Sequence, residues 1–147
     1  MTTYTFLVPG IPVPQGSKRA MLHAQSNRVV MFDQRSDKLA EYRANIIQAV
    51  ATSELDQPLL GPVFMEITFA FPRPKSHFGT GRNAGVLKAG MSTWHIKTPD
   101  ADKCLRAVLD SLTVAGVWKD DSQVCDVRVI KIYSDMPSTG IKVMSDD

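Results

Sequence analysis

Apolar and polar residues follow two different periods along this chain, and these periods divide it into strands and helices. Alternation and short apolar runs bounded by turn residues predict strands at residues 4–8, 28–32, 63–71 and 124–133, with a further short strand at 141–144. Helical spacing predicts one helix from Ser36 to Val50 and a second between Thr98 and Gly116. The order, β-β-α-β-α-β with a candidate last strand, predicts an α+β fold with a mixed sheet of four to five strands and two helices.

The second predicted helix has an amphipathic stripe and recognisable ends. Its apolar positions are Leu105, Val108, Leu109 and Leu112. Thr98-Pro99 ahead of them is typical of a cap followed by a proline in the first turn, and Gly116 ends the helix. Residues two apart on a helix point about 200° away from each other. Asp100 and Asp102 can therefore share a ligand only if Asp100 lies before the first full turn, at an extended-to-helix junction.

Two pairs of aspartates flank this helix, Asp100 with Asp102 and Asp120 with Asp121. A helix of this length is roughly 25 Å long, so the second pair reaches the first only if the chain turns back, and the strand at 124–133 provides that return. Three or four converging carboxylates would suit a hard cation such as Mg²⁺, which takes a few carboxylate oxygens and keeps several waters. The alternative is that one pair decorates a helix start and the other forms a solvated turn, since Asp is common at both places.

Composition is consistent with one domain, because 147 residues with 44% hydrophobic content can bury one core and leave little room for a second. The formal net charge of +2 is unevenly distributed: no acidic residue occurs before Asp33 or between Glu66 and Asp100. Blocks of one sign usually form a solvated surface. Two basic blocks around an acidic cluster also suit a polyanion bound near a metal ion, which we prefer here.

Cysteine usage and hydropathy indicate the cellular compartment of the protein. Cys104 and Cys125 lie inside the helix and strand patterns, where we expect them to be reduced and buried. We find no signal-peptide pattern and no apolar stretch of membrane length, so we expect a cytoplasmic protein without a membrane partner.

Residues 72–98 have no sustained period and are rich in Gly, Pro, Lys and Arg. A stretch of this kind is either functional or a disordered insertion. Aromatic residues interleaved with basic ones suit nucleic acid, with Trp94 as the best aromatic candidate for stacking and buried anchoring as its alternative role. The basic candidates for contacts with DNA, which include two near the N-terminus, are Lys18, Arg19, Arg73, Lys75, Arg82 and Lys97.

Three segments, VPGIPVPQGSKR, PDADKCLRAVLDSL and VWKDDSQV, resemble the RusA family of Holliday-junction resolvases, which is common in bacteria and their phages. The resemblance covers nearly all of the chain except the basic loop, which looks like an insertion at about 72–98. It implies a homodimeric, Mg²⁺-dependent endonuclease, with Mn²⁺ as a substitute ion, that nicks four-way DNA junctions symmetrically.

The resemblance also assigns roles to residues. It implies that Asp100, Asp102 and Asp121 are the metal carboxylates, that Asp120 supports them, and that Arg106 takes the place of a basic residue that matters in the family. Arginine does not lose its proton at working pH, so phosphate clamping or charge stabilisation suits Arg106 better than general-base chemistry. We expect Asp110, on the same helix face, to orient Arg106. Lys103 stands where the family often has Asn, and it is a candidate for contact with DNA.

The combined reading is phosphodiester hydrolysis by metal-activated water in DNA recombination and repair. Two alternatives are a catalytically silent nucleic-acid-binding protein, whose acidic residues are structural, and a nuclease for other branched DNA such as flaps or replication forks.

Overall fold

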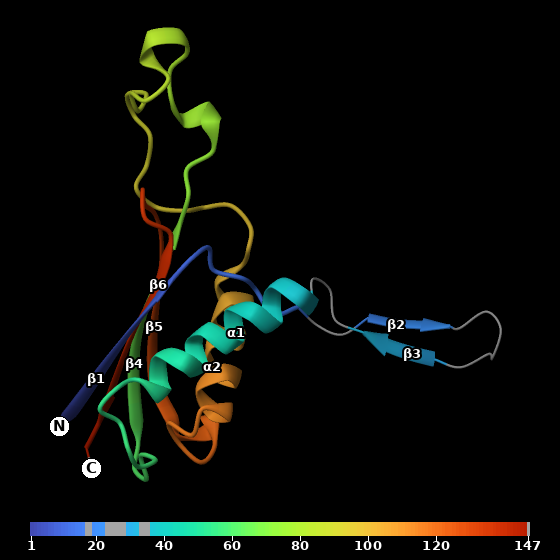
Figure 1. Ribbon diagram of the computed structural model, residues 1–147, viewed down its shortest axis with the longest axis vertical. Coiled ribbons are helices and arrows are strands. Elements are labelled where there is room, and N and C mark those ends of the chain that lie inside the picture. The colour runs from blue at the N-terminus through green and yellow to red at the C-terminus, as the bar shows by residue number, and fades with distance from the viewer. Residues whose placement is uncertain (17–18, 23–28, 33–35, 147) are drawn as a thin grey trace.

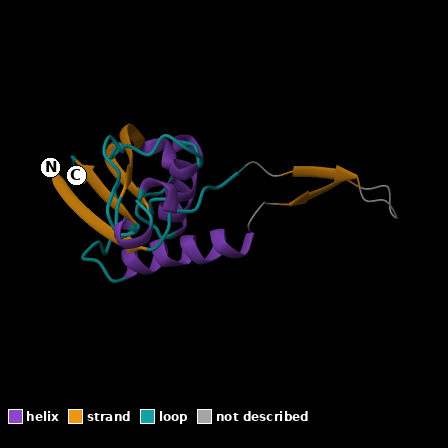
Figure 2. Cartoon of the chain, turned by 90° about the horizontal axis from the view of Figure 1, so that it is seen from above, coloured by secondary structure: helices purple, strands orange, loops and turns teal. Residues whose placement is uncertain are grey.

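The computed structural model describes residues 1–16, 19–22, 29–32 and 36–146. Its main sheet has the order β1-β6-β4-β5, and β4 and β5 are parallel while the other neighbours are antiparallel. The strands of this sheet are β1 (Thr2–Pro9), β4 (Val63–Phe71), β5 (Val124–Tyr133) and β6 (Ser138–Ser145). The helices α1 (Ser36–Ala51) and α2 (Ala101–Val114) lie together on one side of it (Figures 1 and 2). The α+β class and the mixed sheet are confirmed.

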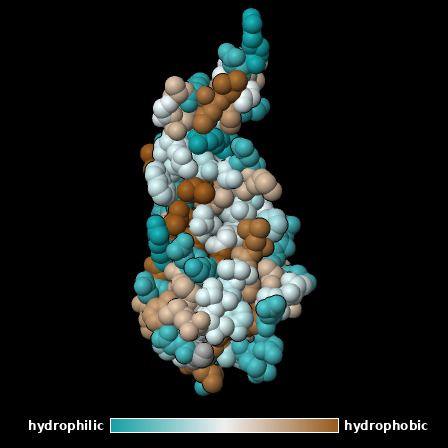
Figure 3. Space-filling view, turned by 90° about the vertical axis from the view of Figure 1, so that its left-hand side faces the viewer, coloured by the Kyte–Doolittle hydropathy of each residue, from teal (hydrophilic) through white to brown (hydrophobic). Residues whose placement is uncertain are grey.

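The core lies between the two helices and the sheet because both helices present an apolar stripe to it. Leu39, Tyr42, Ile46 and Val50 of α1 are buried, as are Cys104, Ala107, Val108 and Leu112 of α2. Alternate residues of β4, from Val63 to Phe71, face them. The other side of the sheet faces away from the helices, and Figure 3 shows that its hydrophobic residues form separate patches among hydrophilic ones.

Two strand predictions need correction. The strand expected at 28–32 is β3 (Val29–Phe32), and it pairs with β2 (Arg19–Leu22) in a separate two-stranded ribbon that projects from the body (Figures 1 and 2). The candidate last strand, β6, is a full inner strand between β1 and β4. Its alternate residues, including Thr139, Ile141 and Val143, are buried, and this explains its inner position.

Helix α2 departs from the prediction at its N-terminal end only. The helix begins at Ala101 with Asp100 as its N-cap residue, so Thr98 is not the cap and Pro99 is not in the first turn. At the other end, Ala115 is the C-cap and Gly116 follows with φ of 81°. This left-handed conformation favours glycine, as the sequence predicted.

Residues 72–97, which we call the basic arm, extend beyond the end of the sheet (Figure 1). The arm contains two short 3-10 turns, η1 (Lys75–His77) and η2 (Gly81–Asn83). Its returning segment is fastened to the edge strand β5, since the Tyr133 amide donates to Thr93 O at 2.8 Å and the His95 amide to Lys131 O at 3.0 Å. The arm is therefore not a structureless insertion at its base.

Three smaller features bear on the sequence predictions. Both cysteines are free, but only Cys104 is buried; Cys125 is exposed beside the register shift between β4 and β5, which contradicts the expectation of burial. The apolar alternation at 124–133 shifts between Val129 and Ile130, which favours a bulge or burial of both faces there; the register shift of the β4–β5 pair lies earlier, between Val63 and Phe64. Among the described residues, no helix combines the length and the apolar character needed to cross a bilayer.

Candidate active site at the acidic helix

The N-terminus of α2 presents two carboxylates. Asp100 has extended backbone geometry, with φ of −70° and ψ of 147°, while Asp102 lies in the first helical turn. This is the extended-to-helix junction expected from the spacing, so the two side chains are not held about 200° apart. Both residues are exposed, and the helix N-terminus favours their negative charge. Lys103 Nζ lies 3.8 Å from Asp100 Oδ2, an exposed pair that contributes about 0–1 kcal/mol.

A buried thiol and a lysine lie behind this pair. Cys104 is fully buried, and burial is the main cause that raises the pKa of its thiol to about 11. The charge of Lys131 acts in the opposite direction, and the charges of Asp100 and Asp102 add to the increase. The charges of Lys131, Asp100 and Asp102 therefore all act on this thiol.

The middle of α2 carries Arg106 and Asp110, one turn apart on the face of Asp102. Arg106 is exposed. Asp110 accepts a hydrogen bond from the side-chain amide of Gln15, whose backbone amide donates to Lys103 O at 3.0 Å. The ion pairs among the described residues are Lys103–Asp100 and Arg128–Glu66. In the structure, the carboxylate of Asp110 bonds Gln15 of the N-terminal segment and forms no ion pair with Arg106 among the described residues. Asp110 therefore does not orient Arg106, contrary to the expectation.

The second acidic pair lies beyond the other end of α2, around the short turn η3 (Asp121–Gln123). Asp120 caps this turn: its carboxylate accepts from the Ser122 amide at 2.8 Å, and this bond is the main cause that lowers its pKa. Gln123 completes the capping box and donates to Leu59 O at 2.9 Å. Asp121 is exposed, and its pKa is raised by desolvation first and then by the charge of Asp120, with a smaller effect of Asp110.

The two pairs do not meet within one chain. Asp121 comes just before β5, so the returning strand carries Val124 to Tyr133 back toward the start of α2 and leaves Asp121 behind. The 14 residues of α2 span about 21 Å, and the helix aspartate whose charge Asp121 senses is Asp110. Within the described ranges, no three His, Cys, Asp or Glu side chains are close enough to hold a metal ion. The expected single-chain pocket is therefore absent from this part of the chain, and the ligand roles stay predictions.

The candidate residues for contacts with DNA are distributed over the arm and the helix start. Lys75, Arg82, Lys97 and Lys103 are exposed. Arg73 is half-buried at the base of the arm, where it donates to Ser92 O at 3.0 Å and lies 5.0 Å from the Tyr133 ring centroid. Trp94 is 58% exposed, which rules out buried anchoring. Lys18 and the side chain of Arg19 lie outside the described residues.

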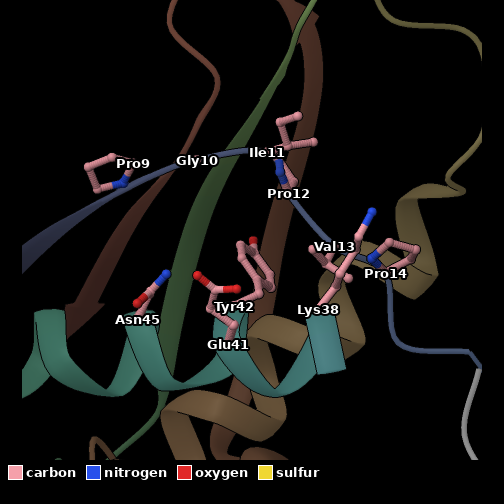
Figure 4. A pocket seen from close by; sticks show the side chains of 10 residues that line it. All are labelled: Pro9, Gly10, Ile11, Pro12, Val13, Pro14, Lys38, Glu41, Tyr42 and Asn45. Atoms are coloured by element: carbon pink, nitrogen blue, oxygen red, sulfur yellow. The ribbon is translucent and has the colours of Figure 1, made fainter. Parts of the chain in front are cut away.

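A groove on the α1 side of the molecule does not belong to this site. Figure 4 shows Glu41 and Tyr42 of α1 pointing toward residues 9–14, which form its opposite wall. None of the predicted metal-binding or catalytic aspartates lines it.

Sequence reasoning missed two residues near the acidic helix. The contact of Gln15 with Asp110 could not be read from the sequence, because the two residues are 95 positions apart. Lys131 left a visible signal, since it occupies the same face of β5 as Val127 and Val129, where the alternation expects an apolar residue.

Comparison with known proteins gives consistent results. A family described as endodeoxyribonuclease RusA matches residues 9–144. The uncharacterized protein YqaN of Bacillus subtilis (strain 168) is 31% identical over 144 residues, covering 97% of this chain and 96% of that protein. Crossover junction endodeoxyribonuclease RusA of Escherichia coli (strain K12) is 26% identical over 132 residues, covering 90% of this chain and 85% of that protein. The protein of the same name from Enterobacteria phage 82 shows the same identity and coverage. Because the family match extends over nearly the whole chain, from the N-terminal proline-rich segment to the last strand, the chain belongs to the RusA family of endodeoxyribonucleases.

Proposed function

We propose that this protein is a Holliday-junction resolvase, which makes paired nicks in four-way DNA by metal-dependent phosphodiester hydrolysis during recombination and repair in the bacterial cytoplasm. The main support is the exposed pair Asp100 and Asp102 at the start of α2, in a chain of an endodeoxyribonuclease family. Relatives from Escherichia coli and phage 82 are named crossover junction endodeoxyribonucleases, which supports a branched DNA substrate.

Asp100 and Asp102 are the residues that we propose hold Mg²⁺, or Mn²⁺ in its place. Mg²⁺ is commonly held by one or two carboxylates together with waters and substrate phosphates, so an exposed aspartate pair beside a bound phosphate fits its requirements. When bound, the cation lowers the pKa of a coordinated water and offsets charge on the attacked phosphate. In its absence the two carboxylates repel the DNA backbone, because like charges face each other.

The position of Asp121 supports a dimer. It follows the C-terminal end of α2, whereas Asp100 precedes the first residue of the helix, so a second copy would have to bring it to the pair. A two-fold axis that places the α2 helices of two chains antiparallel would put Asp121 of the partner subunit beside Asp100 and Asp102, and would create two equivalent sites. Two equivalent sites are also what paired nicks on opposite strands require.

The basic residues would position the DNA. Arg106 is exposed one turn after Asp102, where its planar guanidinium suits a bidentate contact with a phosphate. Lys75, Arg82 and Lys97 of the basic arm are exposed in a stretch without acidic residues, which suits contacts with the backbone of a DNA arm. Trp94, exposed at the base of the arm, is available for stacking on an unpaired base.

The test is incubation of the full chain with an end-labelled four-way junction, with Mg²⁺ and with a chelator. We expect nicks at symmetric positions on opposite strands with Mg²⁺ and intact DNA with the chelator. Forked and linear duplexes of the same sequence are the comparison substrates. Cleavage of forks in preference to junctions would indicate a nuclease for other branched DNA, and binding without any Mg²⁺-dependent product would refute the nuclease proposal.

A further inference from the structure

Lys131 occupies a position where the fold expects an apolar residue. On β5, Val127 and Val129 pack against the core and Tyr133 is buried in it. Lys131 shares their face by the two-residue period of a strand, so its side chain starts toward the helix side of the sheet. It is half-buried. Because a charge on such a face needs a compensating partner, its contacts indicate why the position holds a lysine.

The contacts of Lys131 converge on the segment that leads into α2. Its Nζ donates to Lys97 O at 2.8 Å, and its backbone O accepts from the His95 amide at 3.0 Å. One residue thus fastens the chain at two points, through its main chain and its ammonium group. Lys97 lies three residues before Asp100, so the bond from Lys131 Nζ to Lys97 O holds the segment that leads to the first carboxylate.

Two lysine ammonium groups make contacts in the segment that carries the acidic pair: Lys131 with Lys97 O and Lys103 with Asp100. Among the described residues, Lys103 forms an ion pair with Asp100, but that pair is exposed and contributes little to position. Lys131 makes the shorter contact of the two, 2.8 Å from Nζ to Lys97 O against 3.8 Å from Lys103 Nζ to Asp100 Oδ2.

We propose that Lys131 is a positioning residue for the cation site: its hydrogen bond to Lys97 O fixes the chain that leads to Asp100, one of the two carboxylates that would hold Mg²⁺. This inference rests on the proposed function. Residues that orient metal ligands typically affect metal affinity or activity by about 10- to 100-fold when they are changed. Lys131 would exert this effect through the backbone, without touching the ion or the DNA.

Charge and positioning make opposite predictions for the loss of this lysine. If Lys131 were only a nearby positive charge, its removal would strengthen cation binding, because like charges would no longer repel. If it positions the carboxylates, removal would weaken cation binding. Lys131→Met has a similar length without donors, and Lys131→Arg keeps both the charge and the donors.

The experiment is an EPR titration of the full chain and its variants with Mn²⁺, followed by nicking of a four-way junction over a range of Mg²⁺ concentrations. We expect Lys131→Met to raise the half-saturating concentration of both ions about 10- to 100-fold and to leave junction binding in chelator unchanged. Lys131→Arg should restore most of the affinity. Lys142→Met is the matched control, since Lys142 is an exposed lysine on β6 and lies away from the acidic pair.

Unchanged or tighter Mn²⁺ binding by Lys131→Met would overturn the inference. Thermal unfolding of each variant checks that the fold is intact, and Lys131→Gln provides the same comparison with a polar side chain if the Met variant unfolds. The wild-type chain separates the two proposals: failure to nick in Mg²⁺ refutes the resolvase function, whereas normal nicking with an unaffected Lys131→Met refutes the role of Lys131 alone.

Discussion

At the residue scale, the proposed cation site depends on one aspartate lying outside the helix and another inside it. Asp100 is extended and Asp102 is helical, and this change of conformation allows carboxylates two residues apart to serve one ligand. Asp120, by contrast, uses its carboxylate to cap η3. Asp120 thus accepts a backbone hydrogen bond, whereas Asp100 and Asp102 are exposed at the start of α2.

Changing Asp102 to Asn should abolish nicking and preserve binding. The neutral amide is a weaker ligand for Mg²⁺, so we expect the nicking rate to fall by more than about 100-fold, beyond what changes to supporting residues cause. Binding to a four-way junction in chelator should be equal or tighter, because one charge that repels phosphate is gone. Single-turnover nicking and gel-shift titrations measure the two effects. Asp126→Asn, at an exposed position of β5, is the control, and wild-type nicking by Asp102→Asn would remove this residue from the site.

A second residue-scale prediction concerns stability. The Tyr42 hydroxyl of α1 hydrogen-bonds the Thr139 hydroxyl of β6 inside the core, and burial raises the pKa of this tyrosine. Tyr42→Phe leaves the Thr139 hydroxyl buried without this partner, so we expect a loss of about 1–3 kcal/mol in the free energy of unfolding. Urea denaturation followed by circular dichroism measures it. Adding Thr139→Val should recover most of the loss, because both polar groups are then absent; equal stability of wild type and Tyr42→Phe would contradict the prediction.

At the element scale, the basic arm depends on a cluster of rings at its base. His95 stacks on Phe71 with ring centroids 4.1 Å apart and lies 4.9 Å from the Tyr133 ring. Its Nδ1 is buried without a hydrogen-bond partner among the described residues. His77 and Arg73 contact Tyr133 from the other side. The base is therefore an aromatic contact that excludes water from a titratable ring.

This arrangement makes the base of the arm sensitive to pH. Burial first, and the charge of Lys131 second, lower the pKa of His95 below its ordinary value of 6.5. The folded base favours the neutral ring, so its stability is fully present above about pH 6.5 and decreases as the pH falls below that value. We expect hydrogen exchange of the His95 and Tyr133 amides to show less protection at pH 5 than at pH 7.5, after correction for intrinsic exchange rates.

The variant His95→Phe tests the cause of this dependence. Phenylalanine can keep the stack on Phe71 and cannot be protonated, so the protection of the two amides should become independent of pH over the same range. His77→Phe is the comparison, because this ring makes an edge contact with Tyr133 and lacks the buried nitrogen of His95. If the protection of these amides still depends on pH in His95→Phe, the dependence arises from another titratable group.

At the scale of the whole molecule, the periods of the sequence predicted the elements better than their arrangement. The strands at 63–71 and 124–133 have the predicted bounds, because alternation and turn residues mark both ends. The pairing of β3 with β2 could not be predicted, since four-residue strands carry too few alternating positions to indicate which sheet they join.

A different limit explains why the two aspartate pairs do not come together within one chain as expected. The sequence shows that a strand returns after α2, but the position of Asp121 before that strand, and not after it, decides on which end of the helix the residue lies. A prediction from the sequence of one chain also cannot show which carboxylates a second copy of the chain would contribute to a site. Lys131 was readable in principle, as a lysine that interrupts an apolar face, but its partner is a backbone oxygen 34 residues away.

The proposed dimeric arrangement of the site can be tested by mixing inactive variants. If Asp100 of one chain works with Asp121 of the partner subunit, then a heterodimer of Asp100→Asn and Asp121→Asn contains one site with both changes and one intact site. We expect each variant alone to be inactive and the mixture, after unfolding and refolding together, to nick one strand of a four-way junction. The control mixture combines Asp100→Asn with Asp102→Asn, which leaves no intact site because both residues come from the same end of α2. Rescue in the first mixture and not in the second would establish that each site draws its carboxylates from two chains. No rescue in either mixture, with heterodimers verified by mass spectrometry, would mean that Asp121 does not complete a site across the two-fold axis.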